Sequence, residues 1–167
     1  LIEGNALINA LTAAHQHINK ENESKPLSNK GGASVLVGAL AENVMSFITT
    51  GNCTLYLYRK GKITNVILPD SLNFLCRDQF VGHRSSIPLS GLGLFEDVHY
   101  YLREIKIAEG DILIFLTDGI FSYVDENEIK YAVEKNADQE VEILKTLVKM
   151  ANDRGNLDNQ TGLVLQF

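Results

Sequence analysis

The stretch GDILIFLTDGI, residues 110–120, carries the strongest fold signal in the sequence. Its central apolar run, ILIFL, has the length of a strand and is typical of a strand that is buried on both faces. Asp118 and Gly119 follow this run directly, so the pattern predicts a polar turn at the carboxyl end of the strand. The segments on either side should therefore build a sheet around residues 111–117.

Upstream of this strand, the pattern predicts one helix and then a series of short strands. Residues 5–20 place apolar side chains at helical spacing on one face. Five strands are expected, at 33–40, 43–49, 53–59, 62–68 and 101–107. The turns between the first four are so short that neighbouring strands should be antiparallel. Residues 69–99 show little periodicity, and a stretch of this length is often a functional loop or lid.

Downstream of the strand, two helices and a closing strand are predicted. Asp125 and Glu128 have the spacing of a capping box, which predicts a helix that begins after Asp125. Residues 139–152 again show helical spacing, and Gly155 is placed to end that helix. Residues 161–167 resemble a strand. The elements together predict an α+β fold in which two mainly antiparallel sheets pack together with helices outside them.

Composition limits the class of protein. The 167 residues suffice for one domain with a sizeable core. Lys and Arg number 15 against 21 Asp and Glu, and this net charge of −6 argues against nucleic acid as a partner. No apolar run would span a membrane and no signal peptide is visible, so we expect a cytoplasmic protein without a membrane partner. The sequence does not begin with Met, and we expect a piece of a longer protein.

Asp118 and Asp158 are the candidate metal ligands. Asp118 follows the strand at 111–117, and Asp158 lies just before the strand at 161–167. If these strands are antiparallel neighbours, the end of one lies beside the start of the other, and the two carboxylates meet at one rim of the sheet. Paired carboxylates repel each other unless a cation lies between them, and hard oxygen ligands suit Mg²⁺ or Mn²⁺. Aspartate is also common in turns, so spacing alone leaves open that both residues only shape turns.

Three segments together resemble the metal-dependent protein phosphatase superfamily, the type-2C Ser/Thr phosphatases. Residues 110–120 are similar to the family's strand that ends in Ser/Thr-Asp-Gly before a helix. Residues 151–161, ANDRGNLDNQT, are similar to its closing Asp-Asn-x-Thr motif. Residues 51–61, GNCTLYLYRKG, resemble its Gly-Asp-Ser-Arg strand and the basic turn that follows. The resemblance covers almost all of residues 5–167.

The resemblance implies a four-layer α-β-β-α sandwich and the hydrolysis of phosphoserine and phosphothreonine in phosphoprotein substrates. In the family, two Mg²⁺ or Mn²⁺ ions share a bridging water. Two metals lower the pKa of such a water and stabilise both oxygens of an in-line displacement at phosphorus. Carried over to this chain, Asp118 and Asp158 would be carboxylate ligands of one metal, while the resemblance assigns no catalytic or substrate-binding residue.

The sequence also departs from the family pattern. No residue matches the Asp that bridges both metals in the family, or the His that accompanies it. Asn52 stands where the family has the Asp of its Gly-Asp pair. We therefore expect residues 1–167 to be a single phosphatase-like domain that lacks its amino-terminal strands, and we expect half a metal site in this chain by itself.

Two other functions stay open. A catalytically inactive phosphatase-like domain would bind a partner or regulate it, through residues 69–99, and that binding would survive Asp118→Ala and Asp158→Ala. An unrelated α/β-sandwich binding module would use both aspartates only in turns. Arg84, in the irregular stretch, has the chemistry to bind phosphate, although a solvated loop is the commoner setting for Arg.

Overall fold

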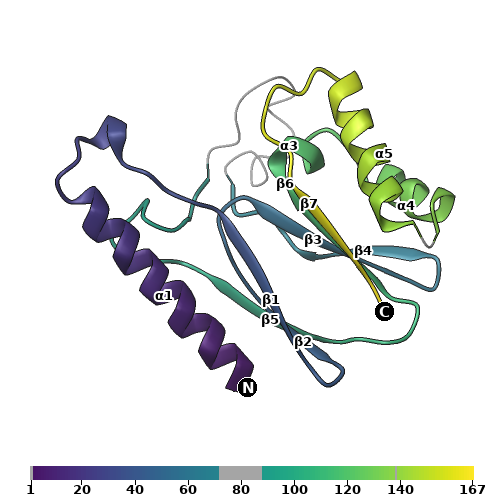
Figure 1. Ribbon diagram of the computed structural model, residues 1–167, viewed down its shortest axis with the longest axis horizontal. Helices are drawn as coiled ribbons and strands as arrows, with labels where there is room; N and C mark the ends of the chain where they lie inside the picture. Colours follow the sequence, from purple (N-terminus) through teal and green to yellow (C-terminus); the bar gives the residue numbers. More distant parts are fainter. Residues whose placement is uncertain (1, 72–87, 138) are drawn as a thin grey trace. The chain divides into compact units, whose positions relative to one another are not determined.

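The computed structural model describes residues 2–71, 88–137 and 139–167, whose contacts divide into two compact units (Figure 1). Each unit contains one sheet and at least one helix, and the described residues form seven strands in all. The predicted α+β class with two mainly antiparallel sheets is therefore confirmed. No helix in the described part of the chain is both long and apolar enough to cross a membrane. A single domain over residues 1–167 stays a prediction.

The first unit comprises the described parts of Leu1–Cys53 and Pro69–Lys106. Its sheet has the strand order β1-β2-β5, and both pairs are antiparallel. Its elements are α1 (Ile2–Asn22), the 3-10 turn Leu27–Asn29, β1 (Val35–Ala41), β2 (Val44–Thr50) and β5 (Tyr101–Lys106). Helix α1 lies along this sheet, and Figure 1 shows it as the long purple ribbon.

The core of the first unit joins α1 to the sheet and to a loop. Leu11 of α1, Ile48 of β2 and Leu92 of the loop are buried against one another. His15 of α1 adds a polar tie, because its Nδ1 accepts a hydrogen bond of 3.2 Å from the N–H of Gly93. His15 is buried and hydrogen-bonded within this unit, so it is part of the unit's core.

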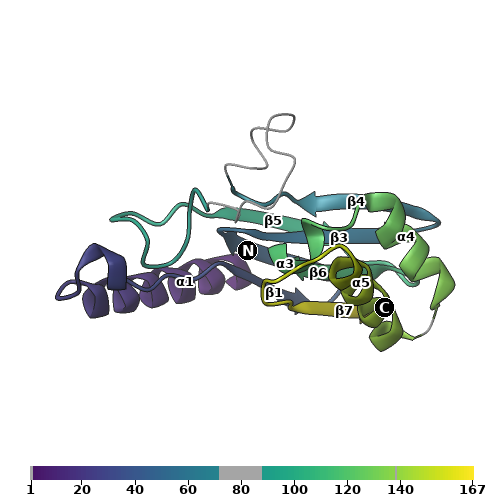
Figure 2. The ribbon, with the colours of Figure 1, turned by 90° about the horizontal axis from the view of Figure 1, so that it is seen from above.

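The second unit comprises Thr54–Leu68 and Ile107–Phe167. Its sheet has the strand order β4-β3-β6-β7. Its elements are β3 (Cys53–Arg59), β4 (Lys62–Ile67), β6 (Ile112–Thr117), α3 (Asp118–Phe121), α4 (Glu126–Lys135), α5 (Glu140–Asp153) and β7 (Gly162–Gln166). The first residue of β3, Cys53, is assigned to the first unit. Helices α4 and α5 pack side by side (Figures 1 and 2).

The core of the second unit lies between its helices and one face of its sheet. Ile114 of β6, Ile129 of α4 and Leu147 of α5 belong to this cluster and are completely buried. Leu113, which points to the opposite face of β6, is completely buried as well. Strand β6 thus lies inside the sheet, between β3 and β7, as its unbroken apolar run predicted.

The predicted helix boundaries of this unit are confirmed in detail. Asp125 caps α4, because its carboxylate accepts from the N–H of Glu128 while the Glu128 carboxylate accepts from the N–H of Asp125. Gly155, two residues after the last residue of α5, has a φ of 80°, which is the left-handed conformation that terminates many helices. The short helix α3 was missed, since its four residues begin at Asp118, where only a turn was expected.

Candidate metal site

The candidate site lies where β6 ends and β7 begins. The two strands are antiparallel neighbours, and Leu116 pairs with Gly162. Beyond this pair, the N–H of Thr117 donates to the carbonyl of Thr161 at 3.1 Å, and the N–H of Thr161 donates to Oγ1 of Thr117 at 3.0 Å. The strand arrangement that the sequence analysis required for a shared rim is therefore present.

Backbone contact continues past the strands at Gly119. A Cβ atom at this position would lie 2.1 Å from the carbonyl oxygen of Asn159 and 3.0 Å from its carbonyl carbon. Only glycine allows so close an approach. Asp118 and Asp158 immediately precede the two residues in contact, so the structure brings the two aspartate-bearing segments together. The missing side chain of Gly119 thus makes room for the Asn159 carbonyl.

Each aspartate is oriented by the peptide that follows it. Oδ1 of Asp118 accepts a hydrogen bond of 3.1 Å from the N–H of Gly119, and Oδ1 of Asp158 accepts one of 2.7 Å from the N–H of Asn159. Asn156 shapes the second segment, because its side chain accepts from the N–H of Asp158 and donates to its carbonyl. An ionised carboxylate has about four acceptor positions, so these bonds are compatible with metal binding.

The chemistry of these donors fits Mg²⁺ or Mn²⁺, while their number is small. Magnesium prefers octahedral oxygen ligands and is often held by one or two carboxylates together with waters. Among residues 2–71, 88–137 and 139–167, no group of three or more His, Cys, Asp or Glu side chains is placed to hold a metal. The two aspartates would therefore supply one side of such a site. Their role as ligands stays a prediction.

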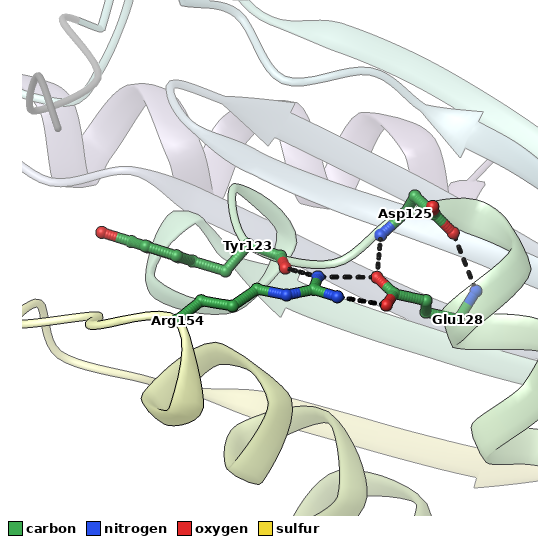
Figure 3. A network of polar contacts seen from close by, with 4 residues as sticks. All are labelled: Tyr123, Asp125, Glu128 and Arg154. Carbon is green, nitrogen blue, oxygen red and sulfur yellow. Dashed lines mark hydrogen bonds and ion pairs between the residues drawn. The ribbon is translucent and has the colours of Figure 1, made fainter. Parts of the chain in front are cut away.

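A network around Arg154 ties the neighbouring helices together (Figure 3). Nη1 of Arg154 donates to Oε2 of Glu128 at 2.7 Å and also to the carbonyl of Tyr123, and Nη2 donates to Oε1 of Glu128. Arg154 is the residue at the end of α5, Glu128 lies in the first turn of α4, and Tyr123 follows α3. The network thus anchors both segments that lead to the rim.

Of this network, the sequence indicates the role of Glu128 but not that of Arg154. Glu128 was identified through its capping-box spacing. Arg154 gave no local signal, because its partner Glu128 is 26 positions away in the sequence.

The pKa of Glu128 is lowered from 4.5 to about 2, first by the hydrogen bond from Arg154 and then by that from the Asp125 N–H. A lowered pKa contributes stability that is present above the unfolded-state value of 4.5 and is lost as the pH falls toward about 2. Glu128→Gln is therefore expected to cost about 1 kcal/mol at neutral pH, a modest value because Arg154 is half exposed and water screens the pair. Urea unfolding at neutral pH and near pH 2 measures the difference.

Glu142→Gln is the matched control for this pH dependence. Glu142 also lies in the first turn of a helix, and its partner Lys145 is an exposed residue three positions away on the same helix. We expect it to cost less than about 0.5 kcal/mol at either pH. A Glu128→Gln cost that stays the same near pH 2 would contradict the assignment of the charged pair.

Gly119→Ala is expected to destabilise the chain by about 1–3 kcal/mol, the usual cost of forcing an atom into filled space. The clash is with backbone atoms of Asn159, which cannot rotate away as a side chain would. Gly31→Ala is the control, because a Cβ at Gly31 would have nothing within 4 Å. Thermal unfolding of both variants compares the two sites, and equal midpoints would show that the Gly119 contact is loose.

Two further expectations of the sequence analysis lie elsewhere. Asn52 is buried in the first unit, where its N–H donates to Oγ of Ser34 at 2.9 Å. Arg84 and most of the irregular stretch at 69–99 lie outside the described residues, so the suggested roles of this stretch stay predictions.

Sequence comparison finds a curated relative that is named as a probable phosphatase. No protein-family model matches the sequence. A curated relative, "Probable protein phosphatase 2C 26" of Arabidopsis thaliana, is 26% identical over 112 residues, which are 66% of this chain and 35% of that protein. The chain thus spans about a third of the length of the curated relative that it matches.

Comparison with solved structures extends the likeness over nearly the whole chain. PppA, a key regulatory component of T6SS in Pseudomonas aeruginosa, matches with a TM-score of 0.82 and 21% identity over 97% of this chain and 69% of its own. The Mycobacterium tuberculosis serine/threonine phosphatase PstP/Ppp matches with a TM-score of 0.81 and 21% identity over 96% and 72%. A structure of the PstP catalytic domain that holds 2 manganese ions matches with a TM-score of 0.73 and 21% identity over 90% and 65%. The resemblance drawn from the three motifs is confirmed, and the chain has the fold of the type-2C, metal-dependent Ser/Thr protein phosphatases.

Proposed function

We propose that this protein hydrolyses phosphoserine and phosphothreonine in phosphoproteins, with Asp118 and Asp158 as carboxylate ligands of one ion in a pair of Mg²⁺ or Mn²⁺ ions. The observation that carries the proposal is the backbone contact of Gly119 with Asn159, which brings the two aspartate-bearing segments to one rim. The likeness to solved type-2C phosphatases, one of which holds 2 manganese ions, supports the same reading.

The role of the chain's own residues follows from charge and position. When bound, the metal pair lowers the pKa of a shared water and stabilises both oxygens of the displacement at phosphorus. Asp118 is half-buried and Asp158 is exposed. Both lie at the end of the sheet where β6 ends and β7 begins. Their two negative charges would offset part of the charge of the cations and would hold one ion at the rim of the sheet.

The substrate class and the location of the protein are also part of what we propose. The net charge of −6 disfavours a nucleic-acid substrate, and the substrate that we propose is a phosphoprotein. We also propose a cytoplasmic location.

An inactive phosphatase-like domain that binds a partner is the second candidate. It is favoured by the small donor set, because the described residues place no third His, Cys, Asp or Glu with the two aspartates. Asn52, where the family has an Asp, points the same way. This candidate predicts no turnover, together with partner binding that is unaffected when the two aspartates are replaced.

Phosphate release from a phosphothreonine peptide distinguishes the two candidates. The full-length protein is assayed with Mn²⁺ and again with an excess of chelator. The proposed function predicts release with Mn²⁺ and none with the chelator. Absence of release under both conditions would favour the inactive domain, and release that the chelator leaves unchanged would exclude metal-dependent hydrolysis.

A further inference from the structure

The side chain of Gln160 connects the two segments that carry the aspartates. Its Nε2 donates one hydrogen bond to the carbonyl of Gly119 at 3.2 Å and another to Oδ1 of Asn152 at 3.1 Å. Gly119 follows Asp118 directly, and Gln160 lies two positions after Asp158. The Gln160 amide lies in the segment that leads into β7. It therefore contacts both Gly119 of α3 and the last turn of α5.

The amide uses its full donor capacity in this arrangement. A glutamine amide has two N–H donors, and here each has an acceptor on a different segment. Gly119 is buried, so its carbonyl oxygen would be costly to leave without a hydrogen bond. The contact is therefore attractive and directional.

Steric contact at Gly119 limits how closely the two segments can approach each other. A Cβ at Gly119 would lie 2.1 Å from the Asn159 carbonyl oxygen and 3.3 Å from Cγ of Gln160. The missing Cβ lets the segments approach, and the Gln160 amide holds them at that approach. Because Asp118 and Asp158 are only one and two positions from these contacts, a shift of the segments moves the carboxylates too.

We propose that Gln160 is a positioning residue for the metal site: its amide holds the Asp118 turn against the Asp158 loop and so sets the affinity of the two carboxylates for a divalent cation. This inference rests on the proposed function for its metal. The hydrogen bonds that orient the Asp118 and Asp158 carboxylates come from the N–H groups of Gly119 and Asn159 and do not involve the Gln160 side chain. Loss of a group that orients a metal ligand typically costs about 10–100-fold in metal affinity.

Gln160→Met tests the role, because methionine has a similar length, adds no charge and donates no hydrogen bond. Gln16→Met, at an exposed position on α1, is the matched control. Mn²⁺ affinity of the full-length protein is measured by the electron paramagnetic resonance signal of free Mn²⁺, and thermal unfolding is measured without metal. We expect Gln160→Met to weaken Mn²⁺ binding at least about tenfold and also to lower the unfolding midpoint relative to Gln16→Met, because the Gly119 carbonyl loses a hydrogen bond.

The outcomes separate this inference from the proposed function. If the unsubstituted protein binds Mn²⁺ and Gln160→Met binds it equally well, the positioning role is wrong. A lowered midpoint with unchanged affinity would likewise reduce Gln160 to a structural residue.

If the unsubstituted protein binds no Mn²⁺, the proposed metal site is wrong. Amide hydrogen exchange then tests separately whether Gln160 holds the two segments together. Faster exchange at residues 117–123 and 156–161 in Gln160→Met, and not in Gln16→Met, would uphold the tie between the segments. Unchanged exchange would overturn it.

Discussion

Asp118→Asn and Asp158→Asn are each expected to lower Mn²⁺-dependent phosphate release by the full-length protein at least about 100-fold. The loss should exceed the 10–100-fold that is typical of groups one step removed from a metal, because each substitution removes a negative charge from a direct ligand. Asparagine keeps the size of the side chain and its oxygen toward the following N–H, so folding should be preserved.

Asp153→Asn is the matched control for these variants. Asp153 is exposed at the end of α5, where its carboxylate pairs with Lys149. Turnover of the control should match that of the unsubstituted protein. Full turnover in Asp118→Asn and Asp158→Asn as well would show that the aspartates only shape turns.

Arg59→Met is expected to destabilise the second unit by about 3 kcal/mol, the range in which a buried carboxylate loses its partner. Nε of Arg59 donates to Oδ1 of Asp111 at 2.7 Å, and Nη2 donates to Oδ2 at 2.5 Å. The Asp111 side chain is only 1% exposed, and its other contact is the Ala108 N–H at 2.8 Å. Removal of the guanidinium therefore leaves a buried charge that is poorly compensated. Urea unfolding measures the loss.

The same pair gives this cost a pH dependence. The hydrogen bonds from Arg59 hold the pKa of Asp111 below its ordinary value of 3.8. Stability from a lowered pKa is present above the ordinary value and is lost as the pH falls below it. The cost of Arg59→Met should therefore shrink in acid. Arg103→Met, at an exposed position on β5, is the control, and an equal loss in both variants would contradict the account.

The order of the elements could be predicted because each has a local signal. The apolar run before Asp118 predicted a buried strand, and the Asp125–Glu128 spacing predicted the start of α4; both are confirmed. These signals depend on neighbours in the sequence, such as side-chain period and capping. The shared rim was predicted only on the condition that β6 and β7 are antiparallel neighbours, and the structure shows that they are.

The contacts that define the rim could not be predicted in the same way. The pairs Arg154–Glu128 and Gln160–Gly119 join residues 26 and 41 positions apart, and no local pattern specifies such partners.

Mn²⁺ titration of the full-length protein, followed by the paramagnetic resonance signal of free Mn²⁺, tests the central claim most directly. The comparison is between the unsubstituted protein and the double variant Asp118→Asn with Asp158→Asn. We predict saturable binding that the double variant loses. Equal binding by both proteins, or binding by neither, would contradict the assignment of a metal site to the rim of β6 and β7.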